Sequence, residues 1–448
     1  MTDTNTKLTH IAGTLLIEAR AAFLNGAGLA AGEARTTTQH KTFREGKNAV
    51  PYVSAQAWRR WLRRTLIEET HWPSSEIRSI AWSKKGTTSK VGGQINPVEY
   101  AEDDLFGYMS AAEGQGSRTA REETDPAEDN GDATDDDAGS ETIKAVMRAS
   151  PLATSVLAAI QSDGWQGRDD GFVHVQSADP EALEAAEWLL TFEAHTPAEV
   201  NKQKEFTDAK KKLKDSIKGK GTQDRLALTR AFAQKFKIED RLQMSNPQSP
   251  LPYSTRFFNT DLEGIFLLDR SRVGVFRNIG DRMELDLAKV KAWEQENAIQ
   301  MIKDVGSQGK IYALPKSAAA AERCKALVKA IAVLRGGAKQ AAFAVDVAPK
   351  VLVLAGLTCG NPILNRLFRE TDKGTELNVE RLREIAKDYR SRLTTSIFIG
   401  IRTGYLANEA DVRKLGKDEK AEGKEIGSTT FVICTPIEAA DLMADKIE

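Results

Sequence analysis

Residues 50–63 read VPYVSAQAWRRWLR, a short apolar run followed directly by an amphipathic helix pattern. Ser54 is the predicted N-cap, because a serine side chain accepts hydrogen bonds from the first free amides of a helix. Trp58, Trp61 and Leu62 recur at helical spacing, which predicts an apolar stripe and places both tryptophans in the core rather than against a ligand. Four arginines lie off this stripe: Arg59, Arg60, Arg63 and Arg64.

Strand patterns lie on both sides of this helix. His10–Ala22 alternates as a strand would, and four of its residues are expected to share one face: Ile11, Leu15, Ile17 and Ala19. Further strand patterns are found at residues 256–259, 264–269, 341–347, 350–355, 397–402 and 429–434. Ala318–Leu334 predicts a helix that Gly336 and Gly337 end, and 409–426 is expected to be a solvated loop. Strands at the beginning, middle and end of the chain, with long helices between them, predict an α+β fold.

The net charge of −1 hides two unlike parts of the chain. Residues 111–141 hold eleven carboxylates and two arginines, net −9, so the remaining residues sum to +8. The acidic segment has almost no large apolar side chains and is expected to be a disordered surface loop. With 448 residues, 41% of them hydrophobic, the chain has enough apolar material for two or three domains.

No pattern in the sequence points to an enzyme. The chain has no Gly-x-x-x-x-Gly-Lys-Ser/Thr loop, no nucleophile elbow and no His-Glu-x-x-His pair. Its five histidines are scattered, and Cys324, Cys359 and Cys434 lack metal-ligand spacing, so we expect buried free thiols, no metal and no cofactor. Neither a signal pattern nor a long apolar run is present, which predicts a soluble cytoplasmic protein that does not contact a membrane.

Two segments are strongly basic. Residues 35–64 carry eight cations against Glu45 alone, net +7, and residues 201–241 carry thirteen cations against six acids, also net +7. A polar loop that leads into an arginine-rich helix suits phosphates spaced along a single strand, because arginine offers bidentate contacts. With one acid in the first segment, its arginines are expected to repel one another unless an anion lies beside them. A solvated helix face is the alternative for each segment.

Five short segments occur in one order along the chain: FLNGAG (23–28), VPYVSAQAWRRWLR (50–63), DLFGY (104–108), FNTDLEG (258–264) and GGAKQ (336–340). Together they resemble the backbone subunit of type I CRISPR Cascade complexes, in the DevR-like autoregulator branch associated with subtype I-B. The Val-Ser-x-Gln-x-x-Arg-Arg helix start and the Gly-x-Lys-Gln turn are the most specific parts. The matches extend from about residue 10 to about residue 360.

The resemblance implies an RRM-like (ferredoxin-like) palm with a large helical fingers insertion and a thumb. Residues 1–72 and 251–448 would form the palm, 73–190 the fingers with the acidic loop 111–141, and 190–250 a basic, helical thumb. The implied function is non-catalytic binding of the guide RNA (crRNA) in antiviral defence. Copies would polymerise as a helical filament along the spacer, beside other Cascade subunits, and present it to the target DNA strand.

The resemblance also implies which residues contact RNA, in four places. These are Asn25 in the first segment; Lys41, Arg44 and Lys47 in the loop before the helix; Ser54, Gln56, Arg59, Arg60 and Arg63 at the start of the first palm helix; and Gly336, Gly337, Lys339 and Gln340 in a second phosphate-facing turn. For the last group, a turn that only caps a helix is the alternative reading.

Two other functions are left open. Related backbone subunits of type III complexes cleave target RNA with an aspartate in the glycine-rich loop after the first strand. Here the corresponding loop has Glu33 and no aspartate. A transcriptional autoregulator that binds duplex DNA is the other alternative, although the sequence shows no helix-turn-helix pattern.

Overall fold

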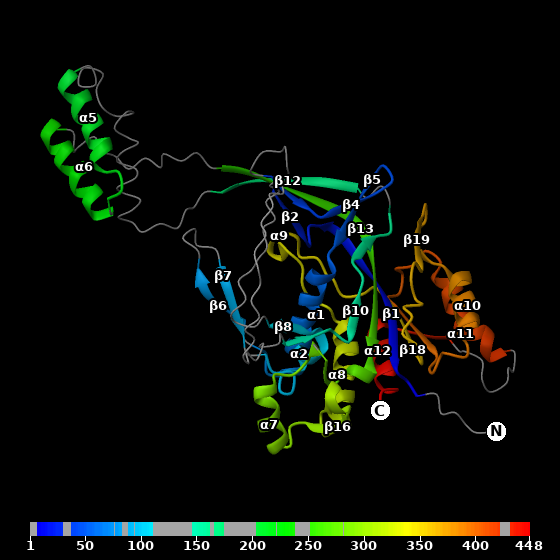
Figure 1. Ribbon diagram of the computed structural model, residues 1–448. Helices are drawn as coiled ribbons and strands as arrows, with labels where there is room; N and C mark the ends of the chain where they lie inside the picture. Colours follow the sequence, from blue (N-terminus) through cyan, green and yellow to red (C-terminus); the bar gives the residue numbers. More distant parts are fainter. Residues whose placement is uncertain are drawn as a thin grey trace, which may run out of the picture. The chain divides into compact units, whose positions relative to one another are not determined.

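A computed structural model of the chain describes residues 7–29, 37–75, 77–82, 88–93, 95–110, 146–161, 165–173, 203–220, 222–237, 251–280, 282–421 and 431–448. These residues form an α+β structure, as the sequence predicts (Figure 1). The chain divides into two compact units: unit 1 comprises Met1–Gly28, Gln39–Gly167 and Arg256–Glu448, and unit 2 comprises Leu29–Thr38 and Arg168–Thr255. The predicted thumb range lies within unit 2.

A central sheet organises unit 1. Its strands lie in the order β22 (Phe431–Cys434), β21 (Ile397–Ile401), β18 (Val351–Leu357), β1 (His10–Ala22), β13 (Leu251–Asp269), β11 (Leu157–Ala159), β5 (Asn48–Val53) and β4 (Thr42–Glu45). Off this path lie β2 (Gly26–Leu29), β3 (Thr37–His40), β10 (Leu152–Thr154) and β12 (Trp165–Val173). β1 and β11 each pair antiparallel with their neighbours. Among the described residues of the central sheet, the parallel pairs are β21 with β22 and β13 with β3. The predicted strands 256–259 and 264–269 are parts of the single strand β13.

Helices cover both faces of this sheet. On one face lie α1 (Ala55–Thr70), α8 (Ser317–Ala332) and α12 (Pro436–Ala444), and on the other α10 (Val379–Asp388) and α11 (Glu409–Ala421). The four residues of β1 predicted to share a face do so, in the core beneath α1 and α8. Ala12 and Leu16, between them, point into the core on the opposite face, because successive side chains of a strand alternate. In α1, Trp58 and Trp61 are buried as predicted.

A second sheet has the order β16 (Gln300–Asp304), β17 (Gly309–Ala313), β14 (Val275–Ile279), β15 (Arg282–Met283), β9 (Val146–Arg148) and β8 (Tyr108–Ser110). Two strand pairs stand apart, β6 (Ile77–Trp82) with β7 (Thr88–Gly93) and β19 (Phe368–Thr371) with β20 (Gly374–Leu377). The remaining elements of unit 1 are α2 (Ala101–Phe106), α7 (Leu287–Gln295), α9 (Gln340–Phe343) and the short 3-10 helices Arg270–Arg272 and Gly306–Gln308.

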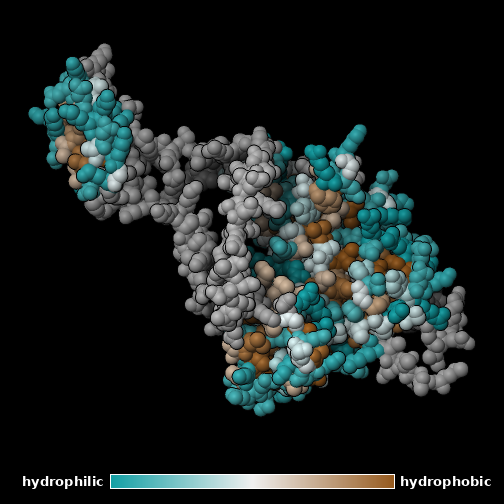
Figure 2. Space-filling model, in the orientation of Figure 1, coloured by the Kyte–Doolittle hydropathy of each residue, from teal (hydrophilic) through white to brown (hydrophobic). Residues whose placement is uncertain are grey.

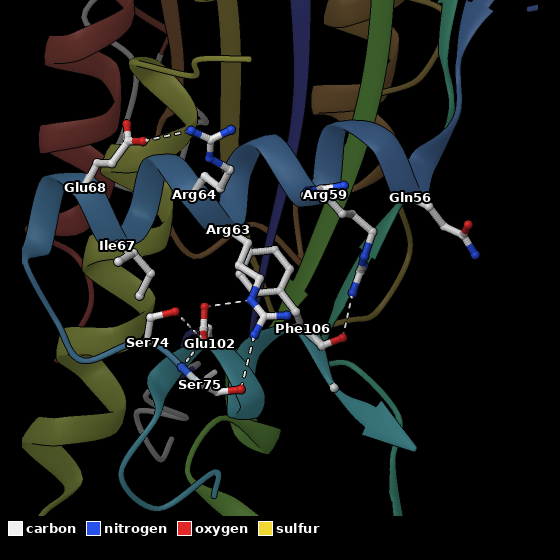
Figure 3. A pocket seen from close by; sticks show the side chains of 12 residues that line it. Gln56, Arg59, Arg63, Arg64, Ile67, Glu68, Ser74, Ser75, Glu102 and Phe106 are labelled. Carbon is white, nitrogen blue, oxygen red and sulfur yellow. Dashed lines mark hydrogen bonds and ion pairs between the residues drawn. The ribbon is translucent and has the colours of Figure 1, made fainter. Parts of the chain in front are cut away.

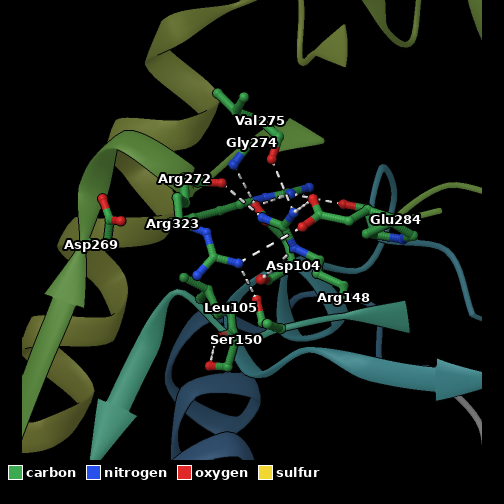
Figure 4. A network of polar contacts seen from close by, with 12 residues as sticks. Asp104, Leu105, Arg148, Ser150, Asp269, Arg272, Gly274, Val275, Glu284 and Arg323 are labelled. Atoms are coloured by element: carbon green, nitrogen blue, oxygen red, sulfur yellow. Dashed lines mark hydrogen bonds and ion pairs between the residues drawn. The ribbon is translucent and has the colours of Figure 1, made fainter. Parts of the chain in front are cut away.

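The DLFGY segment lies at a buried polar network that joins the second sheet to α2 and α8 (Figure 4). Asp104 in α2 is fully buried: its Oδ2 accepts from Arg323 Nη1 at 2.8 Å and from the Gly274 amide at 2.9 Å, and its Oδ1 accepts from Arg148 Nη2. Arg148 in β9 also donates to Glu284 Oε2 at 2.8 Å. Since α2, β9 and α8 each supply a charged group, the segment has a structural role.

Unit 2 contains the lysine-rich part of the chain. The basic stretch predicted to be helical forms α5 (Lys204–Ser216) and α6 (Thr222–Phe236). They pack through Phe206, Phe232 and Phe236, whose ring centroids lie 4.9 to 5.4 Å apart. Figure 2 shows mostly hydrophilic residues on the visible surface of this pair. A small aromatic core thus holds two helices whose outer faces are polar.

Two expectations for the second half of the chain are wrong. Residues 409–426 contain the helix α11, because Val412 and Leu415 fill the core and Glu409 pairs with Arg413 at i,i+4 spacing. In place of a strand at 341–347, residues 341–343 belong to the short helix α9, and 344–347 form neither helix nor strand. The acidic segment 111–141 lies outside the described residues.

The cysteines are free, as expected, but only Cys324 is buried; Cys359 and Cys434 are half-buried. Burial raises the pKa of Cys324 to about 12, which disfavours its reactive thiolate. In the part of the chain that the structure describes, no helix is long and apolar enough to cross a membrane. No group of metal-ligating side chains comes together within the same residues.

Candidate nucleic-acid interface

The start of α1 is fixed to the end of β1. Asn25, just after β1, accepts a hydrogen bond through Oδ1 from the Ser54 amide at 3.0 Å. Its carbonyl accepts from the Lys41 amide at 3.0 Å. Ser54 occupies the N-cap position as predicted, but its side chain makes no capping hydrogen bond. Three of the predicted site residues therefore meet at one corner, where backbone and side-chain contacts hold the first turn of α1.

Arg59 combines a structural and an electrostatic role (Figure 3). Its Nη1 donates to the Leu152 oxygen at 2.5 Å and its Nη2 to the Phe106 oxygen at 2.9 Å. Burial lowers its pKa. Carbonyl oxygens satisfy N–H groups without cancelling the charge. Arg59 therefore anchors α1 through these two carbonyl oxygens, and its guanidinium remains a positive charge that no acid among the described residues cancels.

The guanidinium of Arg63 is paired with two carboxylates. Its Nε lies 2.6 Å from Glu102 Oε2, and its Nη2 lies 3.8 Å from Asp103 Oδ1. The hydrogen bond that Arg63 donates to Glu102 is the main cause that raises the pKa of Arg63. Figure 3 shows this side chain directed at Glu102, beside Ser75. Glu102 is almost completely buried, so Arg63 holds α2 against α1 as well as lining the cleft.

The expectation that the arginines of α1 lack compensating acids is wrong for two of them. Arg63 pairs with Glu102, and Arg64 Nη2 lies 3.6 Å from Glu68 Oε1, one turn further along the same helix. Glu68 also lies 3.3 Å from Arg335 Nε. The repulsion argued from the sequence is therefore weaker than expected. Arg60 alone among the four is exposed with no ion pair to any described residue.

The GGAKQ turn packs against α1 and the end of β1. Gly336 has φ +150°, and a Cβ there would lie 2.3 Å from Trp61 Cγ, so only glycine fits. The Ala338 amide donates to the Leu24 oxygen at 2.7 Å, and Gln340 Nε2 donates to the Gly336 oxygen. Lys339 Nζ lies 5.0 Å from the centroid of the Phe23 ring. The turn is thus brought beside the helix that carries the arginines.

Two clefts flank the exposed side of α1. The first, of about 790 Å³, is lined by Gln56, Arg59, Arg60, Arg63, Arg64, Ile67, Glu68, Ser74, Ser75, Glu102, Phe106 and Gly107 (Figure 3). The second, of about 600 Å³, is lined by Leu24, Asn25, Ala57, Arg60, Trp61, Arg64, Glu68, Arg335, Gly336, Gly337, Ala338 and Gln340. Arg60 and Arg64 belong to both. A polyanion that followed either cleft would meet these two side chains.

Some of the predicted site residues lie away from the two clefts. Arg44 lies on β4 and Lys47 in the following turn, both exposed, and neither lines either cleft. Arg64 and Arg335, which do line the clefts, were not among the predicted site residues. The spacing of four between Arg60 and Arg64, and the position of Arg335 directly before the glycines, are the sequence signals for them.

Comparisons with known proteins find solved structures of low sequence identity and low TM-score. No protein-family model and no curated protein matches the chain. A solved structure described as "CRISPR RNA-guided surveillance complex" is 10% identical with a TM-score of 0.40, covering 98% of this chain and 99% of that one. Another, described as "CRISPR RNA-guided surveillance complex, pre-nicking", is 9% identical with a TM-score of 0.44, covering 98% and 100%. At these values, function has to be inferred from the side chains of this chain.

Glu68→Gln is expected to strengthen nucleic-acid binding. The change frees Arg64, leaves Arg335 paired with Glu69, and removes a negative charge from both clefts. An affinity about fivefold higher at 0.1 M salt corresponds to one more counterion released from a single strand. Fluorescence anisotropy with a labelled single-stranded RNA measures the change. Glu380→Gln, an exposed acid paired with Arg383 on α10, is the matched control and should leave affinity unchanged.

Gly336→Ala is expected to lower the free energy of unfolding by about 2–3 kcal/mol, since it adds a strained φ and a collision with a core tryptophan. Urea unfolding followed by tryptophan fluorescence measures this. Gly280→Ala isolates the backbone part, because Gly280 has φ +59° and nothing within 4 Å of an added Cβ. If Gly336→Ala lowered the free energy of unfolding no more than Gly280→Ala does, the contact with Trp61 would be contradicted.

Proposed function

We propose that the chain is a non-catalytic guide-RNA-binding backbone subunit of a type I CRISPR interference complex, of the Cascade kind and subtype I-B-like. Copies of it bind along the spacer of the crRNA in the cytoplasm and present the bases to a target DNA strand. The affinity comes from phosphate contacts, and the sequence specificity comes from base pairing.

One observation carries the proposal: the two most specific segments of the resemblance meet in space at the basic clefts. The start of α1 supplies Arg59 to the first cleft and Arg60 to both, and the GGAKQ turn lines the second cleft together with Arg60. Arginine donors along a groove fit the phosphates of one strand. A solvated helix face does not require a glycine turn packed beside it.

The arrangement of the strands supports an RRM-like palm. The order β18-β1-β13-β11 has α1 following β1 and α8 between β13 and β18 in the sequence. A ferredoxin-like unit has this pattern of four antiparallel strands with two helices on one face. In that reading, α1 is the first palm helix and α5 with α6 form the thumb.

The absorbance of the purified protein tests the proposal most directly. A ratio of absorbance at 260 to 280 nm above that of protein alone, removed by ribonuclease and not by deoxyribonuclease, is expected. Protein free of nucleic acid that shifts duplex DNA would instead indicate the autoregulator. Cleavage of a complementary RNA by the assembled complex, lost in Glu33→Gln, would indicate an enzyme.

A further inference from the structure

The hairpin of β4 and β5 carries an exposed aromatic ring outside the two arginine clefts. β4 is the last strand at its end of the central sheet, and all four of its residues are exposed (Figure 1). Phe43 on this strand is 38% exposed and lines neither cleft. A phenylalanine on an open edge strand favours unwanted strand pairing unless something covers it. Its exposure is therefore a liability that a covering ligand would remove.

A second aromatic side chain supports this ring. Phe43 lies opposite Val50 in the strand pairing, and Tyr52, two residues after Val50, projects from the same face of β5. The rings of Phe43 and Tyr52 meet edge to face, with centroids 5.7 Å apart and an interplanar angle of 62°. An edge-to-face contact covers at most one face of one ring, so the pair keeps flat surface for stacking.

Three cations lie beside the ring in the same hairpin. Lys41 is two residues before it, Arg44 directly follows it, and Lys47 lies in the turn between the strands. None of the three forms an ion pair with a described residue. Glu45 is the one acid of residues 41–53, so three cations against one carboxylate give a net charge of +2. An aromatic ring among unpaired cations suits a nucleotide, whose base stacks while its phosphates meet the cations.

Backbone hydrogen bonds join this hairpin to the second cleft. The Lys41 amide donates to the Asn25 oxygen at 3.0 Å, and the Tyr52 amide donates to the Lys41 oxygen at 3.0 Å. Asn25 is one of the residues that line the second cleft. Lys41 thus lies between the cleft and the aromatic pair, so a strand that leaves the cleft past Asn25 comes next to the two rings.

We propose that Phe43 stacks on a base of the bound single strand, with Tyr52 supporting the ring and Lys41 and Arg44 meeting the neighbouring phosphates. The proposal rests on the proposed function and adds a base contact to the phosphate contacts of the arginine clefts. Stacking tolerates every base, because every base has a π-face. Phe43 therefore adds affinity without selecting a sequence.

Fluorescence anisotropy on the RNA-free full-length protein tests the stacking, with a labelled single-stranded RNA and an abasic strand of the same length as probes. Phe43→Leu keeps an apolar contact with Tyr52 but has no flat face. We expect it to weaken RNA binding about tenfold, with unchanged affinity for the abasic strand and an unchanged salt dependence. Phe43→Trp should bind RNA at least as tightly as the unchanged protein. Met301→Ala, which alters a 45% exposed apolar residue on the edge strand β16, is the matched control and should leave both affinities unchanged.

The failure of the stacking differs from the failure of the proposed function. If Phe43→Leu binds RNA as tightly as the unchanged protein while Arg60→Gln weakens binding, the stacking is overturned and the RNA-binding function is not. If the unchanged protein binds no single-stranded RNA, both are overturned. An equal loss for the abasic strand also overturns the stacking, because that strand has no base to stack. Unchanged RNA affinity with altered sedimentation of RNA-free Phe43→Leu would assign the ring to a contact between copies of the chain.

Discussion

Asp104→Asn should lower the free energy of unfolding by about 3–5 kcal/mol, the loss typical when one partner of a buried ion pair is removed. Asparagine keeps the shape of the side chain but leaves the guanidinium groups of Arg148 and Arg323 with one carboxylate fewer. Arg323 then loses its carboxylate partner, while the carbonyl oxygens of Pro97 and Val98 still accept from it at 2.9 and 2.7 Å. Urea unfolding measured by circular dichroism gives the change directly.

Asp411→Asn is the matched control for this change. Asp411 lies 2.9 Å from Lys414 on an exposed face of α11, with 63% of its side chain accessible. Solvent screens such a pair, so the expected loss is much smaller than that at Asp104. Equal losses at the two positions would show that the network of Figure 4 is not what holds α2 to α8.

The prediction of the fold from sequence is best where one periodicity dominates. The alternation in His10–Ala22 and the tryptophan stripe of α1 each set a buried face, and the structure has both. The prediction fails where the helix signal is spread over charged residues. In α11 two apolar side chains, an i,i+4 ion pair and an i,i+3 ion pair outweigh a composition typical of a loop.

The candidate site is only partly visible in the sequence. Counting cations locates α1, but it treats Arg59, Arg60 and Arg63 as equivalent. Their different roles depend on the Phe106 carbonyl and on Glu102, which tertiary contacts alone bring to α1. The DLFGY segment illustrates the same limit. Its glycine, Gly107, has φ +74°, and a Cβ there would lie 2.4 Å from the Arg148 oxygen. The need for glycine therefore comes from β9, a strand distant in the sequence.

The double variant Arg60→Gln and Arg64→Gln is expected to weaken RNA binding about a hundredfold at 0.1 M salt, about tenfold for each charge-assisted contact. Both side chains line both clefts, so any path of the strand along α1 loses them. The slope of log affinity against log salt should become shallower by about 1.4, since each phosphate contact with a single strand contributes about 0.7. Anisotropy titrations at four salt concentrations measure both quantities.

Arg59 is left intact in this experiment, because its two carbonyl contacts would be lost with it and the fold would change as well. Arg383→Gln and Arg413→Gln together form the control, since both are exposed helix arginines paired with one acid and remove the same charge. If RNA binding depended on net charge alone, the two double variants would bind RNA with equal affinity. A hundredfold loss with the shallower slope in the α1 variant alone distinguishes a groove that tracks phosphates from a protein that is merely basic in its folded part.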